Sequence, residues 1–119
     1  MSLWRRLTAS RAEQEADELQ RQAEAERSTP ICDCRHGELA TVSGTIRSVT
    51  VRPKEQAPAL EAEVYDGSGA LRVVWLGRRR IPGIDPGRRV TVHGRITCPQ
   101  SEPTIFNPRY ELKPTAGTA

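Results

Sequence analysis

The chain has 119 residues, of which 36% are hydrophobic and 28% are charged. That length allows one domain with a modest core, and no apolar run approaches the roughly 18 residues of a membrane span. Residues 1–6 lack the apolar segment of a signal peptide, and three cysteines fit a reducing compartment better than a disulfide framework. We therefore expect a cytoplasmic protein with no membrane partner.

Charge divides unevenly along the chain. Residues 1–38 carry six basic and eight acidic residues, whereas residues 39–119 carry twelve basic and seven acidic residues. Sixteen of the eighteen basic residues are arginine, whose planar guanidinium suits bidentate phosphate contacts and stacking on bases. This distribution favours an anionic partner for the C-terminal part, although a GC-rich genome is an alternative source of the arginine excess.

The N-terminal third predicts one helix. Ser10 and Glu13 match a capping box, and from there to Arg27 the chain has no glycine, proline or aromatic residue. The apolar stripe of this helix is thin and consists of small residues, namely Ala12, Ala16, Leu19 and Ala23. We expect a solvated helix that frays or packs loosely and ends at residues 28–30; a helix that binds a partner or associates with itself is the alternative.

A central hairpin organises the rest of the chain. Residues 66–69 read Asp-Gly-Ser-Gly, a tight turn in which both glycines supply positive φ. Apolar residues alternate on both sides of this turn, at Leu60, Ala62 and Val64 and again at Leu71, Val73 and Trp75. Before the hairpin, residues 38–52 predict a long strand whose alternation slips around Ser48, which indicates a bulge or sharp bend.

After the hairpin, residues 78–87 contain two Pro-Gly steps and leave no room for a helix of useful length. Residues 88–97 predict a fourth strand, and residues 104–112 a fifth that is interrupted at Pro108, as suits an edge or closing strand. Polar loops occupy residues 53–58 and 98–103. Five short strands, the first strongly bent, indicate a small mainly β barrel preceded by one α-helix, because closure removes exposed edges.

With these strands in place, the pattern resembles the OB-fold, a five-stranded Greek-key barrel. The resemblance is to small stand-alone bacterial OB-fold nucleic-acid-binding proteins and, more distantly, to anticodon-binding OB-folds and the wedge domain of fork-rescuing DNA helicases. It rests on residues 42–46, 65–71, 73–75 and 86–94 and covers about residues 39–112. We therefore divide the chain into a charged helix and linker (1–30), an OB-fold barrel (31–113) and a disordered tail (114–119).

The resemblance implies a ligand across the outer faces of the second and third strands, between the loops at 53–58 and 98–103. Alternation exposes Arg47, Tyr65 and Arg72 on that face. We expect further nucleic-acid contacts from Arg52, Lys54, Arg78, Arg79, Arg80, Arg95 and Arg109. Trp75 has two interpretations, a core residue by its parity or a stacking platform for a base, and it is included among the candidates. Glu61 and Glu63 share the expected face and would repel phosphate.

A second constellation combines three cysteines and a histidine. In an extended segment Cys32, Cys34 and His36 share one face, and antiparallel strands would bring Cys98 near them, which is a conceivable tetrahedral zinc set. Because C-x-C with a histidine two residues later is not a common zinc spacing, we expect idle or buried thiols, no metal and no cofactor.

No catalytic constellation is evident, and we expect no enzymatic activity. The function hypothesis is a module that binds single-stranded or branched nucleic acid, DNA more than RNA, with little sequence specificity. The alternative is a protein–protein interaction adaptor that uses the barrel or the N-terminal helix.

Overall fold

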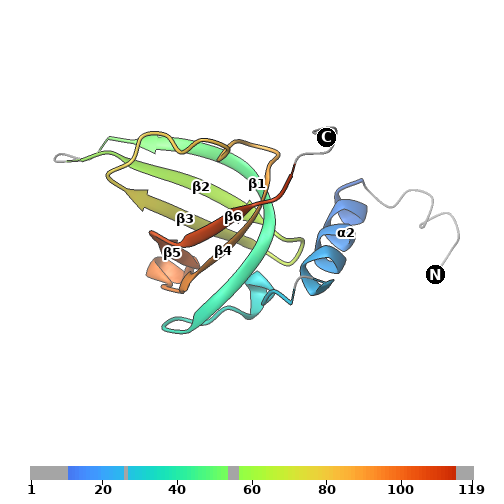
Figure 1. Ribbon diagram of the computed structural model, residues 1–119. Helices are drawn as coiled ribbons and strands as arrows, with labels where there is room; N and C mark the ends of the chain where they lie inside the picture. Colours follow the sequence, from blue (N-terminus) through green and yellow to red (C-terminus); the bar gives the residue numbers. More distant parts are fainter. Residues whose placement is uncertain (1–10, 26, 54–56, 115–119) are drawn as a thin grey trace, which may run out of the picture.

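A strongly curled sheet with one helix laid across it makes up the described part of the chain (Figure 1). The computed structural model describes residues 11–25, 27–53 and 57–114. Its helical elements are α2 (Arg11–Ala25) and the short 3-10 turns η1 (Ile31–Asp33) and η2 (Pro99–Ser101). Its strands are β1 (Leu39–Arg52), β2 (Ala59–Tyr65), β3 (Ala70–Leu76), β4 (Arg89–Arg95), β5 (Thr104–Phe106) and β6 (Arg109–Leu112).

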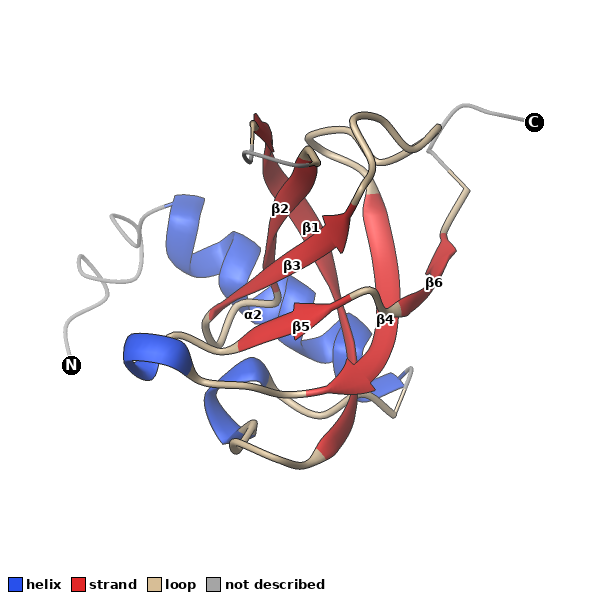
Figure 2. Ribbon diagram, turned by 90° about the vertical axis from the view of Figure 1, so that its left-hand side faces the viewer, coloured by secondary structure: helices blue, strands red, loops and turns tan. Residues whose placement is uncertain are grey.

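The sheet has the order β5-β3-β2-β1-β4-β6. All neighbouring strands are antiparallel except β3 and β5, which are parallel. Figure 2 shows β5 between β3 and β4, where a single bridge joins Thr97 to Thr104, but the hydrogen-bonded ladder does not close. The mainly β, OB-like class with an N-terminal helix is confirmed.

The sheet has six strands where five were expected, because the interruption predicted at Pro108 divides the last strand in two. Asn107 adopts a left-handed backbone conformation (φ 50°) at this break. As a result, residues 104–106 pair with β3, whereas residues 109–112 turn away and pair with β4.

The alternation read from the hairpin is confirmed in the core. The buried apolar side chains include Val42, Ile46, Leu60, Val64, Leu71, Val73, Val90, Val92, Ile96 and Ile105. The bulge predicted near Ser48 lies between Ile46 and Ser48, so Arg47 is the extra residue of β1. The segment after β3 contributes Ile81 and Ile84 to the same core, and these two side chains fill space where many OB-folds place a helix.

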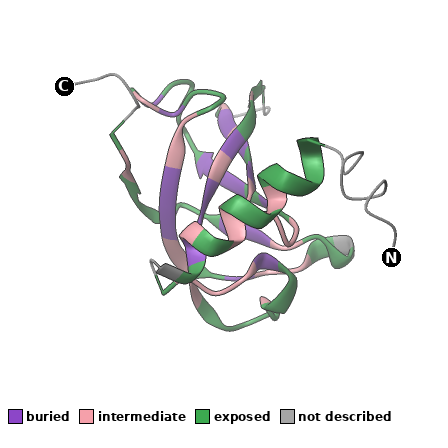
Figure 3. Cartoon of the chain, turned by 90° about the vertical axis from the view of Figure 1, so that its right-hand side faces the viewer, coloured by how far each residue is buried: buried purple, intermediate pink, exposed green. Residues whose placement is uncertain are grey.

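Helix α2 lies across the sheet (Figure 3). Most of its described side chains are exposed, as expected for a solvated helix, but it makes specific close contacts with the sheet and with the β2–β3 turn. Ala23 is buried, and the backbone of Ala16 lies so close to Gly67 in the β2–β3 turn that a Cβ at Gly67 would collide with the Ala16 carbonyl oxygen. The small side chains of the stripe permit this close approach. Beyond the helix, the hydroxyl of Ser28 lies 2.5 Å from that of Ser43 on β1.

The end of α2 is a Schellman motif. The amide of Ser28 donates to the Ala23 carbonyl, the amide of Arg27 donates to the Glu24 carbonyl, and Arg27 has a φ of 59°. The predicted capping residue Ser10 and residues 115–119 of the predicted tail lie outside the described residues. Within the described part of the chain, no helix is long and apolar enough to cross a bilayer.

The β2–β3 turn is built around the carboxylate of Asp66, which is 1% exposed. It accepts hydrogen bonds from the Ser68 amide (2.8 Å), the Ser68 hydroxyl (2.7 Å), the Gly69 amide (3.2 Å) and, across the chain, the Ile31 amide (2.8 Å). Gly67 has the expected positive φ of 90°, but Gly69 does not; a Cβ there would press against Ile31. The turn therefore anchors η1 as well as the hairpin.

Candidate nucleic-acid interface

The outer face of β1, β2 and β3 carries an open groove of about 340 Å³. Strand register arranges the residues of this face in rows: one of Ser48, Glu63, Arg72 and Thr104, a second of Thr50, Glu61, Val74 and Phe106, and a third of Arg52, Ala59 and Leu76. Of these residues, Ser48, Thr50, Arg52, Glu61, Glu63 and Arg72 line the groove. Residues 101–103 of the η2 loop line the same groove, as the resemblance implies for the 98–103 loop. We call this surface the front groove.

An apolar strip lies on the same sheet face as the front groove. Phe106 is 47% exposed and Leu76 is 51% exposed, while Val74 beside them is buried. An exposed phenyl ring on a sheet face is a flat surface on which an unstacked base can lie. Phe106 was not among the contacts predicted from the sequence, because residues 104–112 were expected to form one last strand and its division into β5 and β6 was not foreseen.

The cations of the front groove are paired with carboxylates. Arg52 Nε lies 2.5 Å from the carboxylate of Glu61, and Arg72 Nη2 lies 2.6 Å from that of Glu102. Both arginine side chains are substantially exposed, and exposed ion pairs contribute only about 0–1 kcal/mol to stability. The expected repulsion by Glu61 is therefore offset by a neighbouring guanidinium, while Glu63 stays an exposed carboxylate at the groove.

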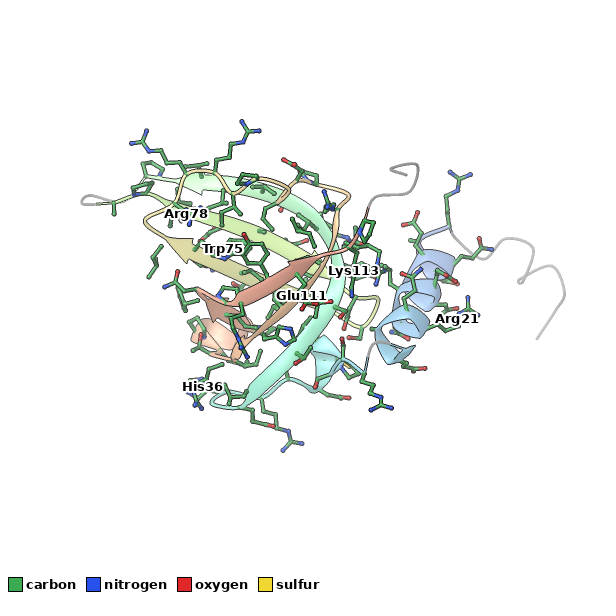
Figure 4. The ribbon with its side chains drawn as sticks, in the orientation of Figure 1. Arg21, His36, Trp75, Arg78, Glu111 and Lys113 are labelled. Carbon is green, nitrogen blue, oxygen red and sulfur yellow. The ribbon has the colours of Figure 1, made fainter. Side chains whose placement is uncertain are left out.

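Three consecutive arginines leave β3 at one end of the front groove. The chain turns at Gly77, whose amide donates to the Pro58 carbonyl, and Arg78, Arg79 and Arg80 follow, all exposed. Figure 4 shows Arg78 beside the end of β3. Arg52 closes β1 at this same end, because Arg52, Ala59 and Leu76 share a row. Together these residues form a cationic end to the groove.

Arg47 and Tyr65 were expected on the binding face but lie in the cleft between α2 and the sheet. The bulge turns Arg47 so that its guanidinium stacks over the Tyr65 ring, 3.5 Å from the ring centroid. Gln22 of the helix and Arg89 of β4 are hydrogen-bonded in the same cleft. The helix thus occupies the part of the sheet on which Tyr65 was predicted to stack on a base.

Trp75 is a core residue, 6% exposed, so its prediction as a stacking platform was wrong. Its ring meets that of Tyr110 edge to face, with 5.7 Å between centroids, and Figure 4 shows it directed into the space between the strands. Its parity with Leu71 and Val73 places it inward, as the core interpretation held.

Two other predicted contacts lie away from the front groove. Arg95 on β4 donates to the Gly37 carbonyl at 2.5 Å, and Arg109 on β6 lines a pocket over β1, β4 and β6. Both point outward as expected, but the curled sheet turns the outer face of β4 and β6 to another side of the molecule. Lys54 lies outside the described residues.

The cysteines and the histidine do not form a metal site in the described part of the chain, which contains no group of three or more potential ligands. Residues 31–33 form the 3-10 turn η1 rather than an extended segment, so the shared face assumed for Cys32, Cys34 and His36 does not exist. His36 does approach Cys98, but its Nδ1 accepts the backbone amide of Cys98 (3.1 Å). Burial, helped by the nearby carboxylate of Asp66, raises the pKa of the Cys34 thiol to about 11.

Comparisons with known proteins bear on the fold. No protein-family model and no curated protein matches the chain. Among solved structures, a chain in "Structure of RecG bound to three-way DNA junction" is similar, with a TM-score of 0.58 and 24% sequence identity. The match covers 71% of this chain and 12% of that chain, so this protein corresponds to a small part of that larger one. The similarity supports an OB-like fold.

Proposed function

We propose that this protein binds nucleic acid through the front groove, with single-stranded or branched DNA as the preferred form. The observation that carries the proposal is the exposed Phe106 ring on the sheet face that also carries Arg52 and Arg72. Support comes from the fold, since the similar RecG chain was solved with a DNA junction. Duplex bases are stacked on one another, so an exposed flat ring on the same sheet face as the groove favours unpaired strands.

The proposed binding mode exchanges carboxylates for phosphates. The ion pairs of Arg52 and Arg72 are exposed, so a backbone phosphate can replace Glu102 as the partner of Arg72 at little cost in free energy. In this mode a base stacks on Phe106, and residues 78–80 attract the negatively charged strand. Stacking and phosphate contacts carry little base information, and we propose low sequence specificity on that ground. We propose binding without catalysis, in a reducing cytoplasm; the three free cysteines agree with that compartment.

The arginine cluster is tested by fluorescence anisotropy of labelled single-stranded DNA and RNA at several salt concentrations. Replacing Arg78, Arg79 and Arg80 together with alanine should weaken binding and lower the log–log salt slope by about 2, since each lost phosphate contact on a single strand removes about 0.7. The control removes equal charge elsewhere, by Arg11→Ala, Arg21→Ala and Arg35→Ala. Equal slopes for the two triple variants would overturn the role of the cluster.

The stacking role of Phe106 is tested by Phe106→Ala and Phe106→Leu in the same assay. Loss of base stacking should weaken binding by about 1–3 kcal/mol in the alanine variant. The leucine variant keeps an apolar side chain but has no flat ring, so it should bind almost as weakly. Full affinity in Phe106→Leu would show that the position contributes packing and not stacking.

A protein-interaction adaptor is the second candidate function. The favouring observation is that the front groove pairs its arginines with Glu61 and Glu102, while Leu76 and Phe106 are exposed on the same sheet face, a mixture suited to a protein surface. Helix α2 is less suited to this role than expected, because its apolar stripe already faces the sheet. An oligonucleotide titration without binding at low salt would reject the first candidate and leave the adaptor.

A further inference from the structure

A second basic pocket lies on the outer surface of β1, β4 and β6, away from the front groove. Strand register places Thr41, His93 and Arg109 in one row across these three strands. The hydroxyl of Thr41 lies 2.9 Å from Nδ1 of His93. The pocket measures about 430 Å³, and we call it the rear pocket.

Arg27 joins this row from the end of α2. The amide of Thr29 donates to the Thr41 carbonyl at 2.8 Å and so holds the linker after the helix against β1. Arg27 occupies the left-handed position of the helix cap, where glycine is the usual residue because a side chain is strained there. At this strained position the chain carries an arginine, and that arginine lines the rear pocket.

The charges of the rear pocket differ from those of the front groove. Arg27, Arg109 and His93 line it together with the hydroxyls of Thr29 and Thr41, and no described carboxylate does. Neither arginine forms an ion pair with a described carboxylate. Glu111 on β6 lies in the next row, opposite Thr91. Two guanidiniums that form no ion pair within the described residues, together with adjacent hydroxyl groups, make a site for an oxyanion.

We infer that the rear pocket is a second phosphate-binding site, which takes a backbone phosphate of the nucleic acid bound in the front groove. This inference rests on the proposed function. Strand β1 contributes to both surfaces, with Ser48, Thr50 and Arg52 in the front groove and residues 39–41 in the rear pocket. The two surfaces then hold separate segments of one long or branched ligand.

The test combines anisotropy with two pairs of variants. The probe is labelled single-stranded DNA of about 20 nucleotides, longer than the roughly 4–16 that one OB fold covers. The variant Arg27→Gln/Arg109→Gln should lower the salt slope by about 1.4, because two phosphate contacts are lost. The control Arg21→Gln/Arg35→Gln removes the same charge and should leave the slope close to the wild-type value.

The variant Arg27→Gly distinguishes a loss of binding from a loss of stability. Glycine suits the left-handed cap, so this variant should unfold at a higher temperature than the wild type while binding the oligonucleotide more weakly. An unchanged affinity in both Arg27→Gly and the double glutamine variant would overturn the rear pocket and leave the front groove intact. A wild-type protein that binds no oligonucleotide would instead overturn the proposed function.

Inorganic phosphate distinguishes the source of the anion. In a nitrogen-edited NMR titration of the wild type, phosphate should shift the amides of residues 27–29, 39–41 and 93–94. If phosphate shifts them while the double variant binds the oligonucleotide like the wild type, the pocket is a free-phosphate site and its assignment to nucleic acid is wrong. Shifts together with weakened oligonucleotide binding support the inference.

Discussion

The carboxylate of Asp66 joins two segments of backbone that are far apart in the sequence. Its buried carboxylate accepts hydrogen bonds from the turn that follows it and from the Ile31 amide, 35 residues away. A carboxylate that satisfies several amides at once is difficult to replace, because each orphaned donor loses its partner without regaining water. The side chain therefore links the N-terminal segment to the hairpin.

Asp66→Ala should lower the free energy of unfolding by about 3 kcal/mol, since the buried Ile31 amide and the turn amides lose an ionised acceptor. Urea denaturation followed by tryptophan fluorescence measures the change. Asp85→Ala is the matched control, because Asp85 is an exposed turn residue. Equal midpoints for the two variants would contradict the anchoring role.

Cys34 should be a slow nucleophile. Burial raises its thiol pKa from 9.0 to about 11, so at pH 8 far less of it is thiolate than for an ordinary cysteine. Iodoacetamide should therefore modify a variant that retains only Cys34 more slowly than one that retains only the exposed Cys32. Equal alkylation rates at pH 8 would contradict this prediction.

The same shift has a consequence for stability. The folded state holds the Cys34 proton more tightly than the unfolded state, so folding is favoured below pH 9, and that contribution is lost as the pH rises towards about 11. Cys34→Ala should remove this part of the alkaline destabilisation.

At the scale of elements, the docking of α2 depends on glycine at position 67. Gly67 combines a φ of 90° with the close approach of the Ala16 backbone, whereas Gly87 has a φ of 92° and open space around its Cβ position. Substitution of Gly87 therefore measures the free-energy cost of a strained backbone alone, whereas substitution of Gly67 adds the cost of displacing the helix.

Gly87→Ala should cost about 1 kcal/mol from left-handed strain alone, and Gly67→Ala should cost more because the added methyl group pushes α2 off the turn. Limited trypsin digestion checks the second effect: cleavage at Arg21 should accelerate in Gly67→Ala and not in Gly87→Ala. Equal digestion of both variants would show that the helix does not depend on this contact.

The elements themselves were largely predictable. The period of two in residues 60–64 and 71–75 is a local signal, and the phase slip near Ser48 located the bulge to within a residue. The packing of α2 was not predictable, because a stripe of alanines offers little apolar area. Its binding depends on the absence of a side chain at Gly67, far away in the sequence.

The candidate site was predictable only in part. Arg52 and Arg72 lie on the predicted outer face, since their strands are regular, and Arg78 follows the end of β3. Arg47 was misplaced because a bulge decides its direction. Arg109 was misplaced because the sheet is curled, so its outer side faces in several directions. Strand parity predicts that a residue points outward, but it does not predict in which of these directions.

At the scale of the whole molecule, two basic surfaces share β1. The front groove lies towards β2 and β3, the rear pocket lies towards β4 and β6, and α2 crosses the sheet near β1 (Figure 3). Their electrostatics differ: the arginines of the first are paired with carboxylates, whereas those of the second form no ion pair with any carboxylate in the described part of the chain. In the front groove, a phosphate should therefore first displace a carboxylate from its arginine. In the rear pocket, the arginines should attract a phosphate directly.

The two strands at the ends of the sheet order, β5 and β6, are adjacent in the chain and separated only by Asn107 and Pro108. A chain that ends just before residue 104 would keep most of the core sequence, but the outer edges of β3 and β4 would both lack their partner strands. Such a truncated product should therefore aggregate, because unpaired strand edges can pair with other chains.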